Sequence, residues 1–233
     1  MDLILKNARL NGALDLIDIG IENGNIVALE KTLTNALEIV DVEGRLVVPP
    51  FCETHIHLDK SCILSRCSGS GGAIEDAIRE VAQQKKSFTR EDVFKRASIT
   101  LEKAISHGTM YMRTHVEVDP VVGLCGLEGV LDAIKKYQWA IDVEVCVFPQ
   151  EGLTNNPGTE ELIIESLKMG ATVIGAAPYV DTNPHAQIDR IFEIAKEFNV
   201  DIDMHLDLGS SLENMDIEYV CQKTKEYNYQ GRV

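Results

Sequence analysis

The sequence predicts an α/β fold in which a parallel barrel of strand–helix units follows a small β-sheet module. After Pro49-Pro50, apolar strands alternate with helical segments, and this alternation is typical of a parallel sheet with helical crossovers. Before the two prolines, short strands follow one another without helices between them. We therefore divide the chain into a β module at residues 1–48 and a barrel domain at residues 49–233.

The module at residues 1–48 is predicted to be a small antiparallel sheet. A first strand covers residues 2–8, and residues 16–22 alternate apolar and polar side chains, which is the period of a half-buried strand. Asn23-Gly24 predicts a tight turn, because this pair readily adopts positive φ. Further strands are expected at 26–29, 38–41 and 45–48.

The strands predicted for the barrel domain are Val47–Ile56, Thr109–Val118, Ile141–Phe148, Thr172–Ala176 and Val200–Leu206. Thr89, followed three residues later by Asp92, is close to a capping box, so a helix is expected to begin there and to end at Gly108. Asn183 before Pro184 predicts a second helix start, with a capping side chain and a proline at the first helical position.

The length of the barrel domain predicts an incomplete barrel. A closed eight-stranded barrel needs about 250 residues or more, so residues 49–233 hold about five of the eight βα units. Residues 230–233 look like the start of a sixth strand. An open barrel would expose sheet edges that invite aggregation, so we expect this chain to be part of a longer polypeptide.

Composition and charge argue against several classes of binding partner. The chain is 45% hydrophobic and 25% charged, which is ordinary for a globular protein. A net charge of −15 is repelled by phosphate backbones and anionic lipid, which argues against nucleic-acid and membrane partners. The apolar runs are far shorter than the roughly 20 residues that span a bilayer. The start of the chain lacks a signal-peptide pattern and the six cysteines form no CxxC pair, so we expect a cytoplasmic protein with free thiols.

The chemistry centres on His55-Ile56-His57, which follows the first apolar strand of the barrel domain. Side chains two apart on a strand point to one face, so both imidazoles can bind one metal ion at the carboxyl end of a barrel strand. A His-x-His pair alone also occurs often by chance in ordinary strands. Its position directly after the apolar residues 47–51 favours the metal site.

Three segments carry a family resemblance. Residues 40–59, which include the His-x-His pair, resemble the entry segment of the amidohydrolase superfamily. Residues 112–118 are similar to the Arg-Thr-His-Val-Asp-Val stretch of cytosine deaminases, and residues 148–152 are similar to their Phe-Pro-Gln-Glu-Gly. The resemblance covers essentially the whole chain. It implies a (β/α)8 TIM barrel, and it makes the module at residues 1–48 the N-terminal part of a small β-sandwich.

The resemblance also implies a set of site residues. His55, His57 and His205, the last at the end of the fifth strand, would bind one divalent metal ion, zinc or iron. Gln150 would bind the substrate, because a primary amide offers a donor beside an acceptor and so matches a cyclic amide edge. His115 would line the substrate pocket. For His205, the alternative is an ordinary hydrogen-bonded core histidine.

One position departs from cytosine deaminases. They carry a proton-shuttling glutamate three residues after the fifth-strand histidine, and Leu208 stands there in this chain. The neighbouring Asp207 is a catalytic candidate, although strand alternation aims it to the other face. Relatives that remove alkylamino groups from triazines also lack the glutamate, and residues 57–60 resemble their His-x-Met-Asp-Lys. Lys60 is therefore a candidate for polarising the substrate, or else a surface lysine, and Asp119 is a further pocket candidate.

These observations predict a cytosine deaminase-like, metal-dependent hydrolase that removes an amino or alkylamino group from a small pyrimidine- or triazine-like substrate. The resemblance also implies a homo-oligomer. The family's sixth-strand histidine and eighth-strand aspartate have no counterpart within the 233 residues, so this chain by itself is expected to be inactive. The alternatives are an amidohydrolase that opens a cyclic amide or imide, a non-catalytic metal-binding protein, and an α/β domain without a metal.

Overall fold

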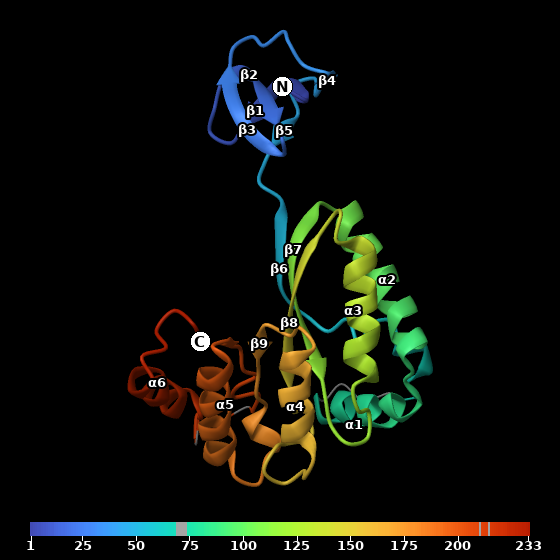
Figure 1. Cartoon of the computed structure of the whole chain (residues 1–233), viewed down its shortest axis with the longest axis vertical. Helices are drawn as coiled ribbons and strands as arrows, with labels where there is room; N and C mark the ends of the chain where they lie inside the picture. The colour runs from blue at the N-terminus through green and yellow to red at the C-terminus, as the bar shows by residue number, and fades with distance from the viewer. Residues whose placement is uncertain (69–73, 210, 214) are drawn as a thin grey trace. The chain divides into compact units, whose positions relative to one another are not determined.

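The computed structural model describes residues 1–233 except 69–73, 210 and 214, and the chain forms two compact units, Met1–Pro50 and Phe51–Val233 (Figure 1). The division lies close to the boundary expected after residue 48. Among the helices in the described ranges, none combines the length and the apolar character needed to cross a membrane.

The strands of the first unit are β1 Leu3–Leu10, β2 Leu16–Glu22, β3 Asn25–Glu30, β4 Glu38–Asp41 and β5 Leu46–Val47. β2 pairs antiparallel with both β1 and β3. β4 and β5 pair parallel with β1, so the expectation of a purely antiparallel sheet was wrong. The chain crosses over between β3 and β4, and the buried Asp18 accepts a hydrogen bond from the backbone N–H of Leu33 in that crossing segment (2.9 Å).

The strands of the second unit are β6 Phe51–Ile56, β7 Thr109–Glu117, β8 Asp142–Phe148, β9 Val173–Ile174 and β10 Asp201–Ile202. They form one parallel sheet in the order β10-β9-β8-β7-β6, which confirms the predicted α/β class. β6 begins at Phe51 and not at Val47, because the intervening Pro49-Pro50 has no N–H to donate. The expected sixth strand is not formed, although Ile202 N–H donates to Arg232 O at 2.8 Å.

The helices of the second unit are α1 Ile74–Gln84, α2 Arg90–Ser106, α3 Cys125–Tyr137, α4 Thr159–Lys168, α5 Pro184–Phe198 and α6 Ile217–Glu226, with short 3₁₀ turns η1 Leu64–Arg66, η2 Lys85–Ser87 and η3 Pro178–Val180. Figure 1 shows α2 and α3 side by side along the strands β6 to β8. Both predicted helix starts are confirmed. Thr89 Oγ1 accepts from Asp92 N–H, and Asn183 Oδ1 accepts from Ala186 N–H, each at 3.2 Å.

α2 and α3 approach each other closely at Gly129. A Cβ added there would lie 2.6 Å from Arg90 O and 2.7 Å from Val93 Cβ, closer than real Cβ atoms come. Gly129→Ala is therefore expected to lower the free energy of unfolding by about 1 to 3 kcal/mol, measured by urea denaturation. Gly126→Ala on the same helix is the control. Its Cβ would meet nothing nearer than 3.7 Å and alanine favours the helix, so this change should be neutral or stabilising. Equal effects from the two changes would contradict the close helix contact.

Candidate metal centre and substrate pocket

Three histidines meet at the carboxyl ends of β6 and β10. His55 lies within β6, His57 follows its last residue, and His205 follows β10. One ring nitrogen from each lies within 4.8 Å of the others, and the Nε2 atoms of His57 and His205 are 3.4 Å apart. Two nitrogens bound at about 2.1 Å to one zinc ion in tetrahedral geometry would be about 3.4 Å apart. The three residues therefore fit a shared divalent metal ion.

Hydrogen bonding prepares His57 for such a role. Its Nδ1 lies 3.2 Å from the backbone oxygen of His115. A carbonyl oxygen only accepts, so Nδ1 carries the proton and the lone pair of Nε2 is directed to His205. The backbone N–H of His205 donates to Ala176 O at 2.9 Å, and its ring stacks on Phe148 with 4.5 Å between ring centroids. Both rings are thus held in place by neighbouring strands.

Electrostatics keeps these imidazoles neutral. Burial, reinforced by the charge of Lys60, lowers the pKa of His57 to about 2. Burial and the neighbouring histidines lower the pKa of His205 to about 3, and burial with His115 lowers the pKa of His55. A neutral imidazole is the form that binds a metal, so at neutral pH protons compete little for these nitrogens.

His115 lies behind His55 and is fully buried. The two rings stack with 4.1 Å between centroids, and His115 Nε2 is 3.4 Å from a carboxylate oxygen of Asp203. Arg113 also donates to Asp203 at 2.9 Å. Burial raises the pKa of Asp203, but the nearby His115 ring and the hydrogen bond from Arg113 lower it to about 2. His115 has no exposed surface in the structure and packs against His55, and its substrate-binding role stays a prediction.

Lys60 is held near the histidines by Asp59, which follows β6, and by Glu117 at the end of β7. The buried Asp59 carboxylate accepts from the backbone N–H of Lys60 (2.9 Å) and of Glu117 (3.0 Å). The Lys60 ammonium forms an ion pair with Glu117 and lies 5.7 Å from the centroid of the Phe148 ring. Its side chain is only 17% exposed. Lys60 is therefore not an exposed surface lysine, which was the alternative considered from the sequence.

Gln150 lies at the carboxyl end of β8 and is nearly buried, with 6% of its surface exposed. Its Nε2 donates to the hydroxyl of Tyr179 at 3.2 Å. Tyr179 belongs to η3, which follows β9, the neighbour of β8 in the sheet. A residue that follows the neighbouring strand therefore orients the Gln150 amide. Sequence reasoning missed Tyr179. A local signal was its place three residues after the end of the predicted strand Thr172–Ala176.

Comparison with known proteins identifies the family. A model described as "Amidohydrolase family" matches residues 38–129. N-isopropylammelide isopropyl amidohydrolase of Pseudomonas sp. (strain ADP) is 33% identical, over 100% of this chain and 60% of that protein. The chain belongs to the amidohydrolase superfamily.

Solved structures place this amidohydrolase among cytosine deaminase-like TIM barrels. 5-methylcytosine deaminase from Klebsiella pneumoniae superimposes with a TM-score of 0.88 at 27% identity, over 97% of this chain and 56% of that one. N-isopropylammelide isopropylaminohydrolase from Burkholderia multivorans ATCC 17616 superimposes with a TM-score of 0.87 at 28% identity, over 100% of this chain and 60% of that one. The chain thus spans less than two thirds of the length of these relatives.

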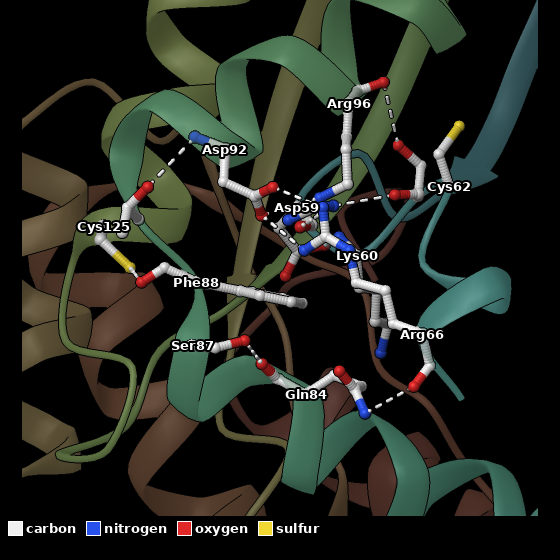
Figure 2. A network of polar contacts seen from close by, with 12 residues as sticks. Asp59, Lys60, Cys62, Arg66, Gln84, Ser87, Phe88, Asp92, Arg96 and Cys125 are labelled. Atoms are coloured by element: carbon white, nitrogen blue, oxygen red, sulfur yellow. Dashed lines mark hydrogen bonds and ion pairs between the residues drawn. The ribbon is translucent and has the colours of Figure 1, made fainter. Parts of the chain in front are cut away.

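A buried arginine fixes the segment that follows His57 in this amidohydrolase. Figure 2 shows Arg96 of α2 at the centre of a polar network. Its Nη1 donates to the backbone oxygens of Asp59 and Ser61, both at 2.8 Å, and its Nε donates to Asp92 at 3.0 Å. The guanidinium lies 4.4 Å from the centroid of the Phe88 ring. The two accepting carbonyls flank Lys60, so Arg96 holds the backbone on both sides of that residue.

Asp207 contacts the start of α6. Its carboxylate accepts backbone N–H bonds from Asp216 (2.7 Å) and Ile217 (3.2 Å), at the start of α6. These two hydrogen bonds direct the carboxylate to the first turn of α6. The catalytic role of Asp207 stays a prediction. Leu208, 43% exposed, follows it and has no proton to transfer.

Proposed function

We propose that the protein is a metal-dependent hydrolase that cleaves the bond between a ring carbon and an exocyclic nitrogen of a pyrimidine- or triazine-like heterocycle. The observation that carries this proposal is the 3.4 Å separation of the Nε2 atoms of His57 and His205, with a nitrogen of His55 in the same group. One divalent ion, zinc or iron, would bind there. Because the chain spans 60% of its Pseudomonas relative, the proposal concerns the activity of the whole protein.

His55, His57 and His205 would hold a divalent ion as neutral imidazoles, and the ion would supply activation of water for attack on the ring. The side chains around it would bind and orient the ring. The Gln150 amide offers a donor and an acceptor to a cyclic amide edge, and its bond to Tyr179 fixes which way the amide faces. The positive charge of Lys60 would stabilise negative charge that develops on the ring during attack.

Removal of an alkylamino group is the form of the reaction that we favour. The 33% identical relative is named an N-isopropylammelide isopropyl amidohydrolase. Leu208 stands where cytosine deaminases carry their glutamate, and a leucine cannot protonate a ring nitrogen. Leu208 lines a cavity whose lining residues are mostly polar, and among them Leu208 and Met215 offer apolar surface to an alkyl substituent.

The test uses the protein expressed from its own gene. Intact mass and metal content come first, followed by assays for alkylamine and ammonia released from alkylamino-triazines, cytosine and isocytosine. We expect about one metal ion per chain, and alkylamine as the main product. A metal-loaded protein that releases neither product from any of these compounds would contradict the proposed function. Ammonia as the main product would contradict the alkylamino preference alone.

Gln150→Ala tests recognition of the ring. A site built to pair with a ring amide loses this pairing when the side chain is removed, so KM should rise by about tenfold to a hundredfold. Metal content should stay at the wild-type value, because Gln150 is not one of the residues proposed to bind the metal. The control is Gln222→Ala on the exposed surface of α6. An unchanged KM for Gln150→Ala would remove Gln150 from the proposed pocket.

A further inference from the structure

A buried lysine on η2 joins the ends of two strands of the site. Lys85 is 4% exposed. Its ammonium lies 2.7 Å from a carboxylate oxygen of Asp119, 2.7 Å from one of Glu151, and 3.3 Å from one of Glu117. Burial lowers the pKa of Lys85, but the three carboxylates raise it to a net value above its ordinary one. Lys85 is therefore a permanent cation among three acids.

These acids lie next to the groups proposed to handle the substrate. Glu117 ends β7 and pairs through its other oxygen with Lys60. Glu151 follows Gln150 directly, after the end of β8. Lys85 is thus connected to Lys60, because both ammonium groups pair with Glu117. It is connected to Gln150, because it pairs with the next residue in the chain, Glu151.

The partners of Lys85 are themselves anchored. Asp119, expected from the sequence to be a pocket residue, is fully buried, and its second oxygen accepts from Val121 N–H (2.7 Å) and Val122 N–H (3.1 Å). On either side of Lys85, Gln84 Nε2 donates to Arg66 O at 2.9 Å and Ser87 Oγ donates to Gln84 O at 2.8 Å, as Figure 2 shows. The lysine is therefore held at a defined position.

We propose that Lys85 is a positioning residue that holds Lys60 and Gln150 in register with each other and so sets the affinity for the ring substrate. This inference rests on the proposed function. Within the described part of the chain, loss of Lys85 would leave Asp119 and Glu151 without an ion-pair partner, and Glu117 with Lys60 alone. Glu117 and Asp119 are almost completely buried. Repulsion among these acids would separate the ends of β7 and β8, and a displacement of about 1 Å in a substrate-positioning group weakens turnover markedly.

The first experiment compares Lys85→Met with Lys86→Met, a matched change at the neighbouring exposed lysine. For Lys85→Met we expect KM to rise at least about tenfold, with metal content unchanged. Hydrogen exchange should increase in residues 58–62 and 149–153 but not in α2 and α3. Lys86→Met should match the wild type in every measurement. A wild-type KM for Lys85→Met, or exchange that rises equally throughout the chain, would overturn the inference.

Two additions keep the test decisive. If Lys85→Met does not fold, the double change Lys85→Met/Asp119→Asn removes one cation and one anion together. It should fold and still show the raised KM, and a wild-type KM in it would overturn the inference. If the wild type turns over none of the heterocycles, the proposed function fails. Hydrogen exchange at residues 58–62 and 149–153 then decides the positioning role of Lys85 without any substrate.

Discussion

His57→Ala is expected to weaken zinc binding by at least about a hundredfold. Removing a residue that only hydrogen-bonds to a metal ligand already weakens metal binding by up to about a hundredfold, so removing a ligand itself should cost at least as much. The change removes one of three imidazoles and leaves His205 without the nitrogen that lies 3.4 Å from its own. Two remaining histidines cannot complete a tetrahedral site. Zinc retained per chain after gel filtration, together with titration calorimetry, measures the loss.

His107→Ala is the matched control for that measurement. His107 is exposed at the end of α2, where its Nδ1 lies 2.7 Å from Lys103 O. In the described part of the chain it is not grouped with the three histidines that could hold a metal. Its replacement should leave zinc binding at the wild-type level. If His57→Ala and His107→Ala retained the same amount of zinc, the metal centre would have to lie elsewhere.

Arg96→Met is expected to lower the free energy of unfolding by about 3 kcal/mol. Methionine fills much of the same space but cannot donate to the carbonyls of Asp59 and Ser61 or pair with Asp92. The two carbonyls would then lose their charged donor inside the protein. Urea unfolding measures the loss, and hydrogen exchange should show that it is largest around Lys60.

Arg90→Met, on the same helix, is the comparison. Arg90 pairs with Asp132, but both side chains are well exposed, at 56% and 39%. An exposed ion pair contributes little to stability, because water and salt screen it, so this change should be nearly neutral. Equal losses from Arg90→Met and Arg96→Met would mean that the buried network adds nothing beyond an ordinary surface pair.

Much of the fold could be predicted because its signals are local. Short sequence patterns predict the capping side chains of Thr89 and Asn183, and both capping hydrogen bonds are present. The spacing of His55 and His57 follows from the two-residue period of a strand. His205 was a different case: its immediate neighbours carry no metal signal, and it was assigned through the family resemblance.

The features that were missed depend on contacts between distant segments. β4 pairs parallel with β1 because the chain between β3 and β4 crosses the sheet. Asp18 of β2 binds that crossing segment through the backbone N–H of Leu33. Arg96 and Lys85 are charged residues in helical segments, where exposure is the ordinary expectation. Each is buried because acceptors from strand ends surround it, and those acceptors lie at least 32 residues away for Lys85 and 35 or more for the carbonyls bound by Arg96. No local pattern shows such a set of partners.

The strand order also has a consequence for how the protein folds. His57 and His205 are 148 residues apart and lie at the two ends of the sheet order β10-β9-β8-β7-β6. A zinc ion bound by both would act as a cross-link that closes one of the longest loops in the chain, and it could form only after every intervening strand had docked. Metal would therefore arrive late in folding and slow unfolding. The melting temperature should rise with free zinc concentration. Because the ion would join the two ends of the sheet, this rise would measure the stability of the sheet as a whole.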